Sequence, residues 1–387
     1  MSWPKVKLGD VAPAIPVKNV NLDEDELVWQ LNLDQIESNT GKIVDKVKQP
    51  LSSAGSSTHF FNNEHVLYSK LRPYLNKVVV PDELGIATTE LVPMKPDQKR
   101  LNKEYLAYYL RSKPFVEWVS TQVSGAKMPR VVMSIFWQHE MPLPPLYEQE
   151  RIVSVLDKSN RLRQKREQAI KLADDFLRAT FLEMFGDPIE NPKGWNVKPL
   201  ADQIVHANNG ISRRRKEDTN EGDIVLRLQD VHYSGIAFDK ELNRIKLVDK
   251  EKQIARVEHD DLLFIRVNGN PNYVGRTAVF KSYIEPVYHN DHLIRIKLDN
   301  EYQSDFLCYL INSPFSRKLI AQQIKTSAGQ HTISQDGILK LMFYRPPIEL
   351  QEKFINIKNK IESIFYRKDK HEDLFASISN KLIHSIK

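Results

Sequence analysis

Glycine is sparse in this chain, and no two glycines lie close together. The 387 residues include 14 glycines, and the two nearest to each other are Gly269 and Gly275. A glycine-rich loop lets the main chain approach a phosphate or a methyl donor without a Cβ in the way. Because no G-x-G pair and no P-loop glycine spacing occurs, the usual nucleotide and S-adenosylmethionine cradles are excluded. We therefore expect no cofactor in this chain.

Cysteine and long apolar runs are also scarce. Cys308 is the one cysteine, which excludes an intrachain disulfide framework and fits a reducing compartment. Its apolar neighbours predict a buried helical thiol rather than a nucleophile. No apolar run approaches the ~20 residues that cross a bilayer, and the first residues lack the apolar region of a signal peptide. These absences predict a cytoplasmic protein with no membrane contact.

Motifs for catalysis or metal binding are broken or weak. The segment 270–273 (Asn-Pro-Asn-Tyr) differs at its third position from the Asn-Pro-Pro-Tyr motif of adenine methyltransferases, and a turn is the simpler interpretation. His289 and His292 would point to opposite sides of a strand, which argues against a metal site. We expect no catalytic residue and no metal ligand. The net charge of +6 and the pI of 9.0 make nucleic acid a plausible partner.

One sequence plan occurs twice in the chain. Pro-Pro-x-x-x-Gln-Glu stands at 144–150 and again, 202 residues later, at 346–352. Further pairs match at slightly different offsets: Tyr109 with Tyr309, Pro114 with Pro314, and Trp3 with Trp195. A drifting offset is what insertions between two diverged copies would give. The chain is therefore predicted to be a mixed domain followed by a long helix, and then both again.

The two long helices are predicted from segments that lack proline and glycine. The first runs from Glu148 to about Phe185 and would be about 55 Å long at about 1.5 Å per residue. The second runs from Glu349 to Lys387, and both carry apolar residues at heptad spacing. Two such helices could pair as an antiparallel coiled coil. The alternative is that each packs only on its own domain.

The predicted fold class is α+β with an internal pseudo-two-fold repeat. Short buried strands are expected at 66–68, 77–80, 225–228, 261–265 and 293–298, and a helix at 102–123 interrupted near Pro114. The predicted division is 1–145 as a first mixed domain, 146–187 as a first spacer helix, 188–345 as a second mixed domain, and 346–387 as a second spacer helix.

Several long segments resemble one known family. Residues 67–77 (Leu-Tyr-Ser-Lys-Leu-Arg-Pro-Tyr-Leu-Asn-Lys), 142–149 and 181–188 are similar to recurring segments of the specificity subunits of type I restriction-modification systems. Residues 261–269 and 274–280 resemble the same family. The resemblance covers essentially the whole chain, including its two-copy layout. At 348–351 the second helix departs from the pattern of the first.

The resemblance implies two target-recognition domains that each read part of a split DNA sequence. The paired helices would separate these domains and bind two copies of a modification subunit. That subunit would carry S-adenosylmethionine and methylate adenine, and a restriction subunit would use ATP and Mg²⁺. On this interpretation the chain has double-stranded DNA and these subunits as partners and catalyses no reaction itself.

Arginine, lysine, asparagine and glutamine are the side chains suited to phosphates and base edges. The DNA-binding candidates are Lys70, Arg72, Tyr74, Asn76, Lys77, Lys127, Arg130, Arg213, Arg214, Arg215, Lys216, Arg266, Asn268, Asn270, Lys325, Gln330 and His331. Segment 72–77 recurs in relatives that read different sequences, so scaffolding or phosphate contact is favoured there over base reading. The same holds for Arg266 and Asn268, whereas 213–216 could simply be a solvated loop.

Two other function classes stay open at this point. One is a DNA methyltransferase fused to its own recognition domain, which the glycine spacing argues against. The other is a coiled-coil adaptor that binds DNA without sequence preference.

Overall fold

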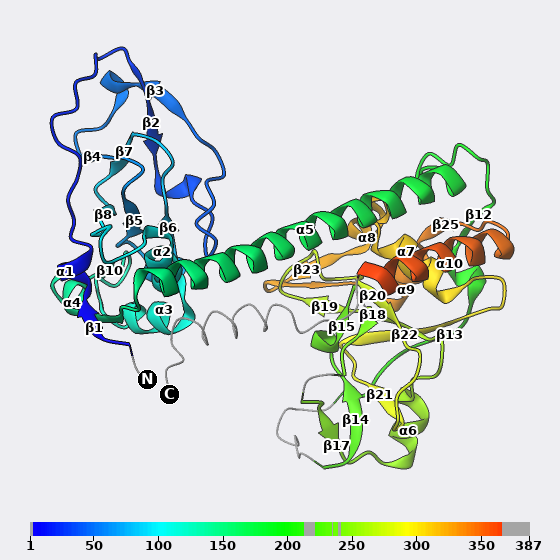
Figure 1. The fold of residues 1–387 in the computed structure, drawn as a ribbon. Helices are drawn as coiled ribbons and strands as arrows, with labels where there is room; N and C mark the ends of the chain where they lie inside the picture. Colours follow the sequence, from blue (N-terminus) through cyan, green and yellow to red (C-terminus); the bar gives the residue numbers. More distant parts are fainter. Residues whose placement is uncertain (1–2, 213–220, 234, 239–240, 366–387) are drawn as a thin grey trace. The chain divides into compact units, whose positions relative to one another are not determined.

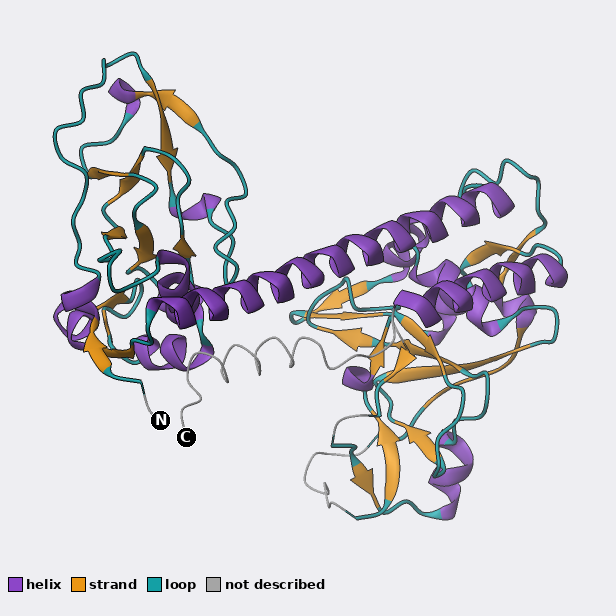
Figure 2. Ribbon diagram, in the orientation of Figure 1, coloured by secondary structure: helices purple, strands orange, loops and turns teal. Residues whose placement is uncertain are grey.

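A computed structural model describes residues 3–212, 221–233, 235–238 and 241–365. Contacts divide the described chain into two compact units, with the division between Gln168 and Ala169. We call residues 3–168 unit 1 and the described residues of 169–365 unit 2, and each is considered by itself. Figures 1 and 2 show strands and helices mixed within each unit. The predicted α+β class is confirmed.

Unit 1 contains short helices, the start of one long helix and several small sheets, the largest of them four-stranded and three-stranded. Its elements are β1 Lys5–Lys7, α1 Leu8–Val11, β2 Leu27–Leu31, β3 Lys48–Pro50, β4 Thr58–Phe61, β5 Val66–Ser69, β6 Val78–Val79, β7 Gly85–Thr88, β8 Leu91–Met94, α2 Lys103–Arg111, α3 Lys113–Ser120, β9 Val123–Ser124, β10 Arg130–Val131, α4 Met133–Gln138, β11 Glu140–Pro142 and the start of α5 Leu146–Phe185. The sheets have the orders β3-β2-β7-β4 and β6-β5-β8, and β1 pairs with β11.

Unit 2 contains the end of α5 and a second series of elements. They are β12 Val197–Pro199, β13 Ile204–Asn209, β14 Asp223–Leu226, β15 Val231–His232, β16 Gly235–Ile236, β17 Arg244–Ile245, α6 Asp249–Ala255, β18 Leu262–Ile265, β19 Val267–Asn268, β20 Thr277–Val279, β21 Val287–His289, β22 Leu293–Leu298, α7 Ser304–Asn312, α8 Pro314–Gln323, β23 Lys325–Ser327, β24 Gln330–Thr332, α9 Gln335–Leu339, β25 Met342–Tyr344 and α10 Ile348–Phe365. Its sheets include β17-β14-β21 and β13-β22-β18-β20.

The repeat seen in the sequence extends through both units. β2 pairs in parallel with β7 and antiparallel with β3, and β14 does the same with β21 and β17. β5 lies between β6 and β8, as β18 lies between β20 and β22. The strand before α1 pairs with the strand before α5, and β12 pairs with β25 in the matching register. Divergence has therefore left the topology of the two copies in place.

Local sequence explains where the helices begin and end. The side chain of Asn102 accepts a hydrogen bond from the Tyr105 N–H (2.9 Å) and caps α2, and Gln303 caps α7 in the same way through Phe306 (3.0 Å). The predicted interruption near Pro114 is confirmed, because α2 ends at Arg111 and α3 begins at Lys113. The predicted strands at 66–68, 77–80, 225–228, 261–265 and 293–298 are also present, with ends shifted by up to two residues.

The long helix α5 belongs to both hydrophobic cores. Ile152 and Leu156 are buried in the core of unit 1, and Phe181 and Phe185 are buried in that of unit 2. Between Leu156 and Ala173 no residue of α5 is buried. The helix stops at Gly186, whose φ of 78° favours glycine.

The predicted pairing of the two long helices is described only where it begins. In unit 2 the Phe354 ring of α10 packs against the rings of Phe181 (5.4 Å between centroids) and Phe185 (5.8 Å) near the end of α5. The heptad positions of the second helix after Phe365 lie outside the described residues.

A buried glutamine ties each long helix to its unit. Oε1 of Gln149 accepts from the Asn102 N–H (2.8 Å), while Nε2 donates to the carbonyls of Arg100 (2.8 Å) and Pro144 (2.7 Å). Gln351 makes the same three bonds to Gln303, Glu301 and Pro346. Both side chains are 0% exposed. The repeated Pro-Pro-x-x-x-Gln segment is therefore a structural joint that orients the first helical turn.

Candidate nucleic-acid interface

The first candidate surface forms where a strand exit meets a β-hairpin in unit 1. After β5 the chain pairs with β10: the Val131 N–H donates to the Lys70 carbonyl (2.9 Å) and the Arg72 N–H to the Pro129 carbonyl (2.8 Å). Residues 70–77 and the hairpin 123–131 are called platform 1. Two groups of candidates that are about 55 residues apart in the sequence therefore lie on one surface. One group is Lys70 and Arg72, and the other is Lys127 and Arg130.

Four of the predicted DNA-binding side chains of platform 1 face solvent. Arg72, Lys127 and Arg130 are exposed, and Tyr74 is 54% exposed. Arg72 has a φ of 49°, a left-handed conformation at the start of the 3₁₀ turn 73–75. The Arg130 guanidinium is partly neutralised, because it lies 2.9 Å from a carboxylate oxygen of Glu90.

Two predicted residues of platform 1 are engaged inside the unit. Asn76 is 7% exposed, and its Nδ2 donates to the Arg111 carbonyl (3.1 Å). The Lys77 ammonium donates to the Leu33 carbonyl (2.6 Å). These contacts favour the scaffolding interpretation of segment 72–77 for its last two residues.

A second surface occupies the equivalent place in unit 2. β19 pairs with β24, so that Asn268 stands opposite His331, and the Ile333 N–H donates to the Arg266 carbonyl (3.0 Å). Residues 266–276 and the hairpin 325–332 are called platform 2. The predicted candidates of the second half are thus also brought together, with the exception of 213–216, which lie outside the described residues.

The polar side chains of platform 2 are partly organised by local bonds. Oδ1 of Asn268 accepts from the Asn270 N–H (2.9 Å), and Nδ1 of His331 lies 2.8 Å from the Thr326 hydroxyl. Arg266 donates through Nη1 to the Asp291 carbonyl (3.0 Å), which holds this guanidinium against the loop after β21. Lys325 and Gln330 are exposed on the hairpin.

A cationic and aromatic cluster at the end of segment 266–276 of platform 2 was not predicted from the sequence. The guanidinium carbon of Arg276 lies 3.8 Å from the ring centroid of Tyr233 and 4.1 Å from that of Tyr273. Both tyrosines keep a large exposed fraction, 52% and 41%. Matching segment 273–276 to 74–77 would have pointed to Tyr273 and Arg276, but nothing in the sequence places Tyr233 near them.

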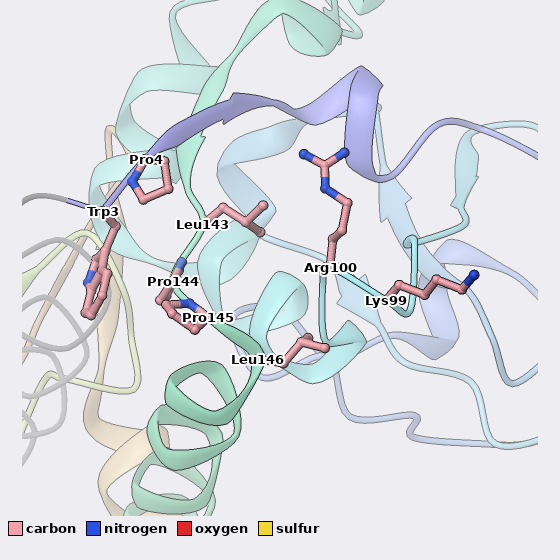
Figure 3. A pocket seen from close by; sticks show the side chains of 8 residues that line it. All are labelled: Trp3, Pro4, Lys99, Arg100, Leu143, Pro144, Pro145 and Leu146. Atoms are coloured by element: carbon pink, nitrogen blue, oxygen red, sulfur yellow. The ribbon is translucent and has the colours of Figure 1, made fainter.

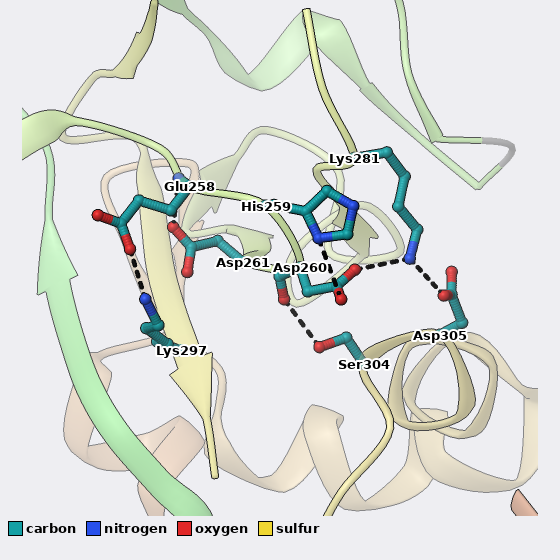
Figure 4. A network of polar contacts seen from close by, with 8 residues as sticks. All are labelled: Glu258, His259, Asp260, Asp261, Lys281, Lys297, Ser304 and Asp305. Atoms are coloured by element: carbon teal, nitrogen blue, oxygen red, sulfur yellow. Dashed lines mark hydrogen bonds and ion pairs between the residues drawn. The ribbon is translucent and has the colours of Figure 1, made fainter. Parts of the chain in front are cut away.

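A polar network fixes the turn that leads into β18. Lys281 bridges Asp260 (2.7 Å) and Asp305 (2.5 Å), and Ser304 donates to the Asp260 carbonyl (2.8 Å), as Figure 4 shows. The buried carboxylate of Asp261 accepts from the Glu258 N–H (2.7 Å). Burial raises the pKa of Asp261 above its usual range, although the Arg295 charge acts in the opposite direction. This network stabilises the scaffold behind platform 2.

The shifted pKa values of His289 and Cys308 result mainly from burial and do not indicate a catalytic role. Desolvation lowers the pKa of His289 to about 4 and raises that of the Cys308 thiol to about 12. An unreactive thiol in α7 was expected; the residue as a whole is only half-buried, while its sulfur contacts the Thr277 carbonyl (3.5 Å). Among the described residues no cluster of His, Cys, Asp and Glu is arranged to hold a metal ion.

An open depression of about 430 Å³ lies at the start of α5 in unit 1. Figure 3 shows Trp3 and Pro4 on one side of the connector 143–146, and Lys99 and Arg100 on the other. In unit 2, Arg345 takes the place of Leu143 and forms an ion pair with Glu301. The two helix entries therefore have the same main chain and different surface charge.

Within the part of the chain that the structure describes, no helix is both long and apolar enough to span a bilayer.

Comparisons with known proteins identify the family. Residues 2–172 match the model of the type I restriction modification DNA specificity domain. The chain is 30% identical over 280 residues to the type I restriction enzyme StySPI specificity subunit of Salmonella potsdam, covering 69% of this chain and 59% of that protein. It is 22% identical to the EcoKI specificity subunit of Escherichia coli K12, with 69% and 60% covered. The chain thus spans about 60% of the length of these two relatives.

Solved structures show the same fold. The type I restriction-modification S subunit from M. genitalium superposes with a TM-score of 0.59 at 16% identity, over 100% of this chain and 97% of that one. A chain from a structure concerned with complex assembly and conformational transition of the type I R-M system gives 0.55 at 17% identity, covering 99% and 97%. With two matched units, each carrying a hairpin platform, and these relatives, the chain belongs to the family of type I restriction-modification specificity subunits.

Proposed function

We propose that this chain is the DNA-recognition subunit of a type I restriction-modification complex and that each unit reads one part of a bipartite target. The observation that carries the proposal is the pair of platforms, which occupy equivalent places on one repeated scaffold. Equivalent placement lets two copies of a fold meet two stretches of DNA in the same manner. Different side chains on the platforms then let them select different sequences.

The platform residues divide by chemistry into two roles. Lys70, Arg72, Lys127 and Lys325 are point charges or exposed guanidinium groups suited to phosphates. Asn268, Asn270, Gln330 and His331 offer paired donors and acceptors that suit base edges. Arg130 is released for DNA when its bond to Glu90 is exchanged for a phosphate or a guanine edge, and Tyr74 offers an exposed ring beside Arg72.

The long helices would bind the modification subunits. In α5 the side chains of Leu162 (70%), Leu172 (69%) and Phe176 (54%) are largely exposed, although each is apolar. Exposed apolar side chains on one helix are suited to a protein partner. We assign 146–187 and 346–387 to spacers that bind two modification subunits, and 1–145 and 188–345 to target recognition. Restriction subunits would join through the modification subunits.

No reaction is assigned to this chain itself. S-adenosylmethionine would belong to the modification subunits, and ATP with Mg²⁺ to the restriction subunits. Since the target is host and invading DNA, the complex would work in the cytoplasm of a bacterium or an archaeon.

Methylation mapping of the host genome tests the proposal. Genomes with and without the gene are sequenced with detection of N6-methyladenine. The expected result is a motif of two short specified parts, separated by unspecified bases, that loses methylation when the gene is deleted. If no methylated adenine motif depends on the gene, the proposal that this chain selects the sequence to be methylated is wrong.

Two further measurements separate the alternatives. Titration of the isolated chain with S-adenosylmethionine should show no binding, whereas a fused methyltransferase would bind it. A gel shift with excess random competitor should leave the mapped motif bound, whereas an adaptor without sequence preference would be displaced.

The role of α5 is tested by capture of the modification subunit. The variant Leu162→Ser with Leu172→Ser should lose most of the captured subunit, because it removes exposed apolar side chains without touching either core. The variant Lys158→Ser changes another exposed residue of the same helix and serves as the control. Full capture by the double variant would contradict the docking assignment.

A further inference from the structure

Arg276 stands out among the cations of unit 2 because it is oriented but unpaired. Its guanidinium packs against the rings of Tyr233 and Tyr273 at 3.8 and 4.1 Å. Within the part of the chain that the structure describes, it has no carboxylate and no hydrogen-bond acceptor, and its Nε is buried without a partner. A guanidinium stacked on aromatic rings keeps its charge and loses much of its rotational freedom. Such a group is prepared for an anion.

The loop that carries Arg276 is held rigidly. Nη2 of Arg317, on α8, donates to the carbonyls of Val274 (2.9 Å) and Pro271 (3.3 Å). Gly275 has a φ of 75°, and a Cβ there would lie 2.6 Å from Cγ2 of Ile320. The loop therefore packs on α8 with no space for a larger residue, and Arg276 is presented from a fixed main chain.

A second guanidinium adds positive charge at the same place. Desolvation lowers the pKa of Arg317, Tyr233 acts in the opposite direction, and the neighbouring Arg276 charge lowers the pKa further. Nη1 of Arg317 is buried without a partner. Two arginines within electrostatic reach of each other, with no carboxylate on either among the described residues, would be stabilised by a bound anion.

Unit 1 has no counterpart of this arrangement. The position equivalent to Arg276 is Lys77, whose ammonium donates into the unit to the Leu33 carbonyl. The position equivalent to Tyr273 is Tyr74, which makes no cation–π contact among the described residues. The cluster is therefore a property of unit 2 rather than of the repeated scaffold.

We propose that Arg276, oriented by Tyr233 and Tyr273, contacts a DNA phosphate at the edge of platform 2. This inference rests on the proposed function, because it takes the anion to be the DNA bound by unit 2. The loop of Arg276 is continuous with β19, whose Asn268 faces the hairpin residue His331, so a duplex on platform 2 brings its backbone to this loop. Arg317 acts as a positioning residue.

The test measures DNA binding by the assembled complex over a series of salt concentrations. The probes are a duplex with the mapped motif and a duplex of random sequence. Arg276→Gln should weaken both by the same factor and make the log–log salt dependence less steep by about 0.9, the value for one phosphate contact. Arg276→Lys should keep the wild-type slope and lose part of the affinity, because the charge stays and the stacking geometry does not.

The control variant is a second arginine of unit 2 that already has a carboxylate partner. Arg244→Gln removes the same charge from unit 2, but its guanidinium is already bound to Glu285 (2.7 Å), so the slope should not change. An unchanged slope in Arg276→Gln would overturn the inference, as would a loss confined to one base pair of the motif. If the wild-type complex fails to prefer the motif over random sequence, the proposed function fails instead, whatever Arg276→Gln does.

The tyrosines provide an independent check. Tyr233→Leu and Tyr273→Leu remove the rings and leave Arg276 in place, so affinity should fall on both duplexes while the salt slope stays. If both variants bind like wild type, orientation by the rings is wrong.

Discussion

His65 precedes strand β5 in unit 1, and Asp261 holds the equivalent place before strand β18 in unit 2. Nδ1 of His65 accepts a hydrogen bond from the Asn62 N–H (3.2 Å), and Oδ2 of Asp261 accepts one from the Glu258 N–H (2.7 Å). One main-chain donor is thus satisfied in the same place by an imidazole and by a carboxylate. The scaffold requires a buried acceptor there and does not specify its type.

The platforms differ more than the scaffold does. In unit 1 the left-handed position after the turn is Asn76, followed by the inward-directed Lys77; in unit 2 it is Gly275, followed by the stacked Arg276. Buried hydrogen-bond requirements have preserved the main chain of both copies, while exposed side chains were free to diverge.

Loss of a helix-entry glutamine should have the largest effect. Gln149→Ala leaves one part-buried N–H, one part-buried carbonyl and one buried carbonyl without their partner, at an expected cost on the order of 4 kcal/mol. Gln351→Ala should cost unit 2 a similar amount, because its bonds are the same. Hydrogen exchange of α2 and α7 would report each unit separately. The control Gln122→Ala loses a bond to an exposed hydroxyl and should change stability little. A much smaller cost in one unit than in the other would show that the two helix-entry glutamines are not equivalent.

Acid should destabilise unit 2 through His289, which has no titratable counterpart in unit 1. The equivalent position in the parallel strand pair is the buried Ala87. The folded pKa of His289 is about 4, below its unfolded value of about 6.5, so its stabilising effect is complete above pH 6.5 and is lost as the pH falls toward 4. The loss should be about 3 kcal/mol.

Urea unfolding at pH 7, 5.5 and 4.5 would measure this loss. His289→Asn places an amide nitrogen where Nδ1 stands, so it keeps a donor for the Ala255 carbonyl and removes the titration. Unit 2 of this variant should be less sensitive to acid than that of the wild type. Equal acid sensitivity in variant and wild type would show that His289 is not the cause.

Exchange of the left-handed residues should not be symmetric. Gly275→Asn should cost about 2 kcal/mol or more, since its Cβ meets Ile320 and an Asn there must adopt a positive φ. Asn76→Gly relieves the positive φ and loses one bond to the Arg111 carbonyl, so about 1 kcal/mol is expected. Thermal unfolding of both variants would measure these costs. Equal costs would contradict the tighter packing of the main chain at Gly275.

Single exposed lysines should have the smallest effect. Lys127→Gln on platform 1 and Lys325→Gln on platform 2 should each make the salt dependence of DNA binding less steep by about 0.9, without altering the preferred sequence. Lys340→Gln is the matched control, because its ammonium is already paired with Asp336 (2.7 Å). A change of preferred sequence would assign that lysine to base reading.

Local sequence patterns were sufficient for the first long helix, the helices on either side of Pro114, five of the strands and the repeat. Proline at 114 and glycine at 186 interrupt helices through main-chain geometry alone, so their effect is readable without a fold. The platforms were predictable only in part. Residues 70–77 and 124–130 were each recognised as candidates, but their adjacency depends on a strand pairing between Leu71 and Arg130.

The sequence alone determined that the chain is two copies of one α+β plan, because proline positions, apolar patterns and repeated motifs are local or periodic. Tertiary structure decided which polar residues remain for a partner. Lys77 and Arg276 hold equivalent positions and both are cations, yet one is bound to a carbonyl and the other is stacked and unpaired among the described residues. That difference comes from long-range contacts, with Leu33 in one unit and Tyr233 in the other.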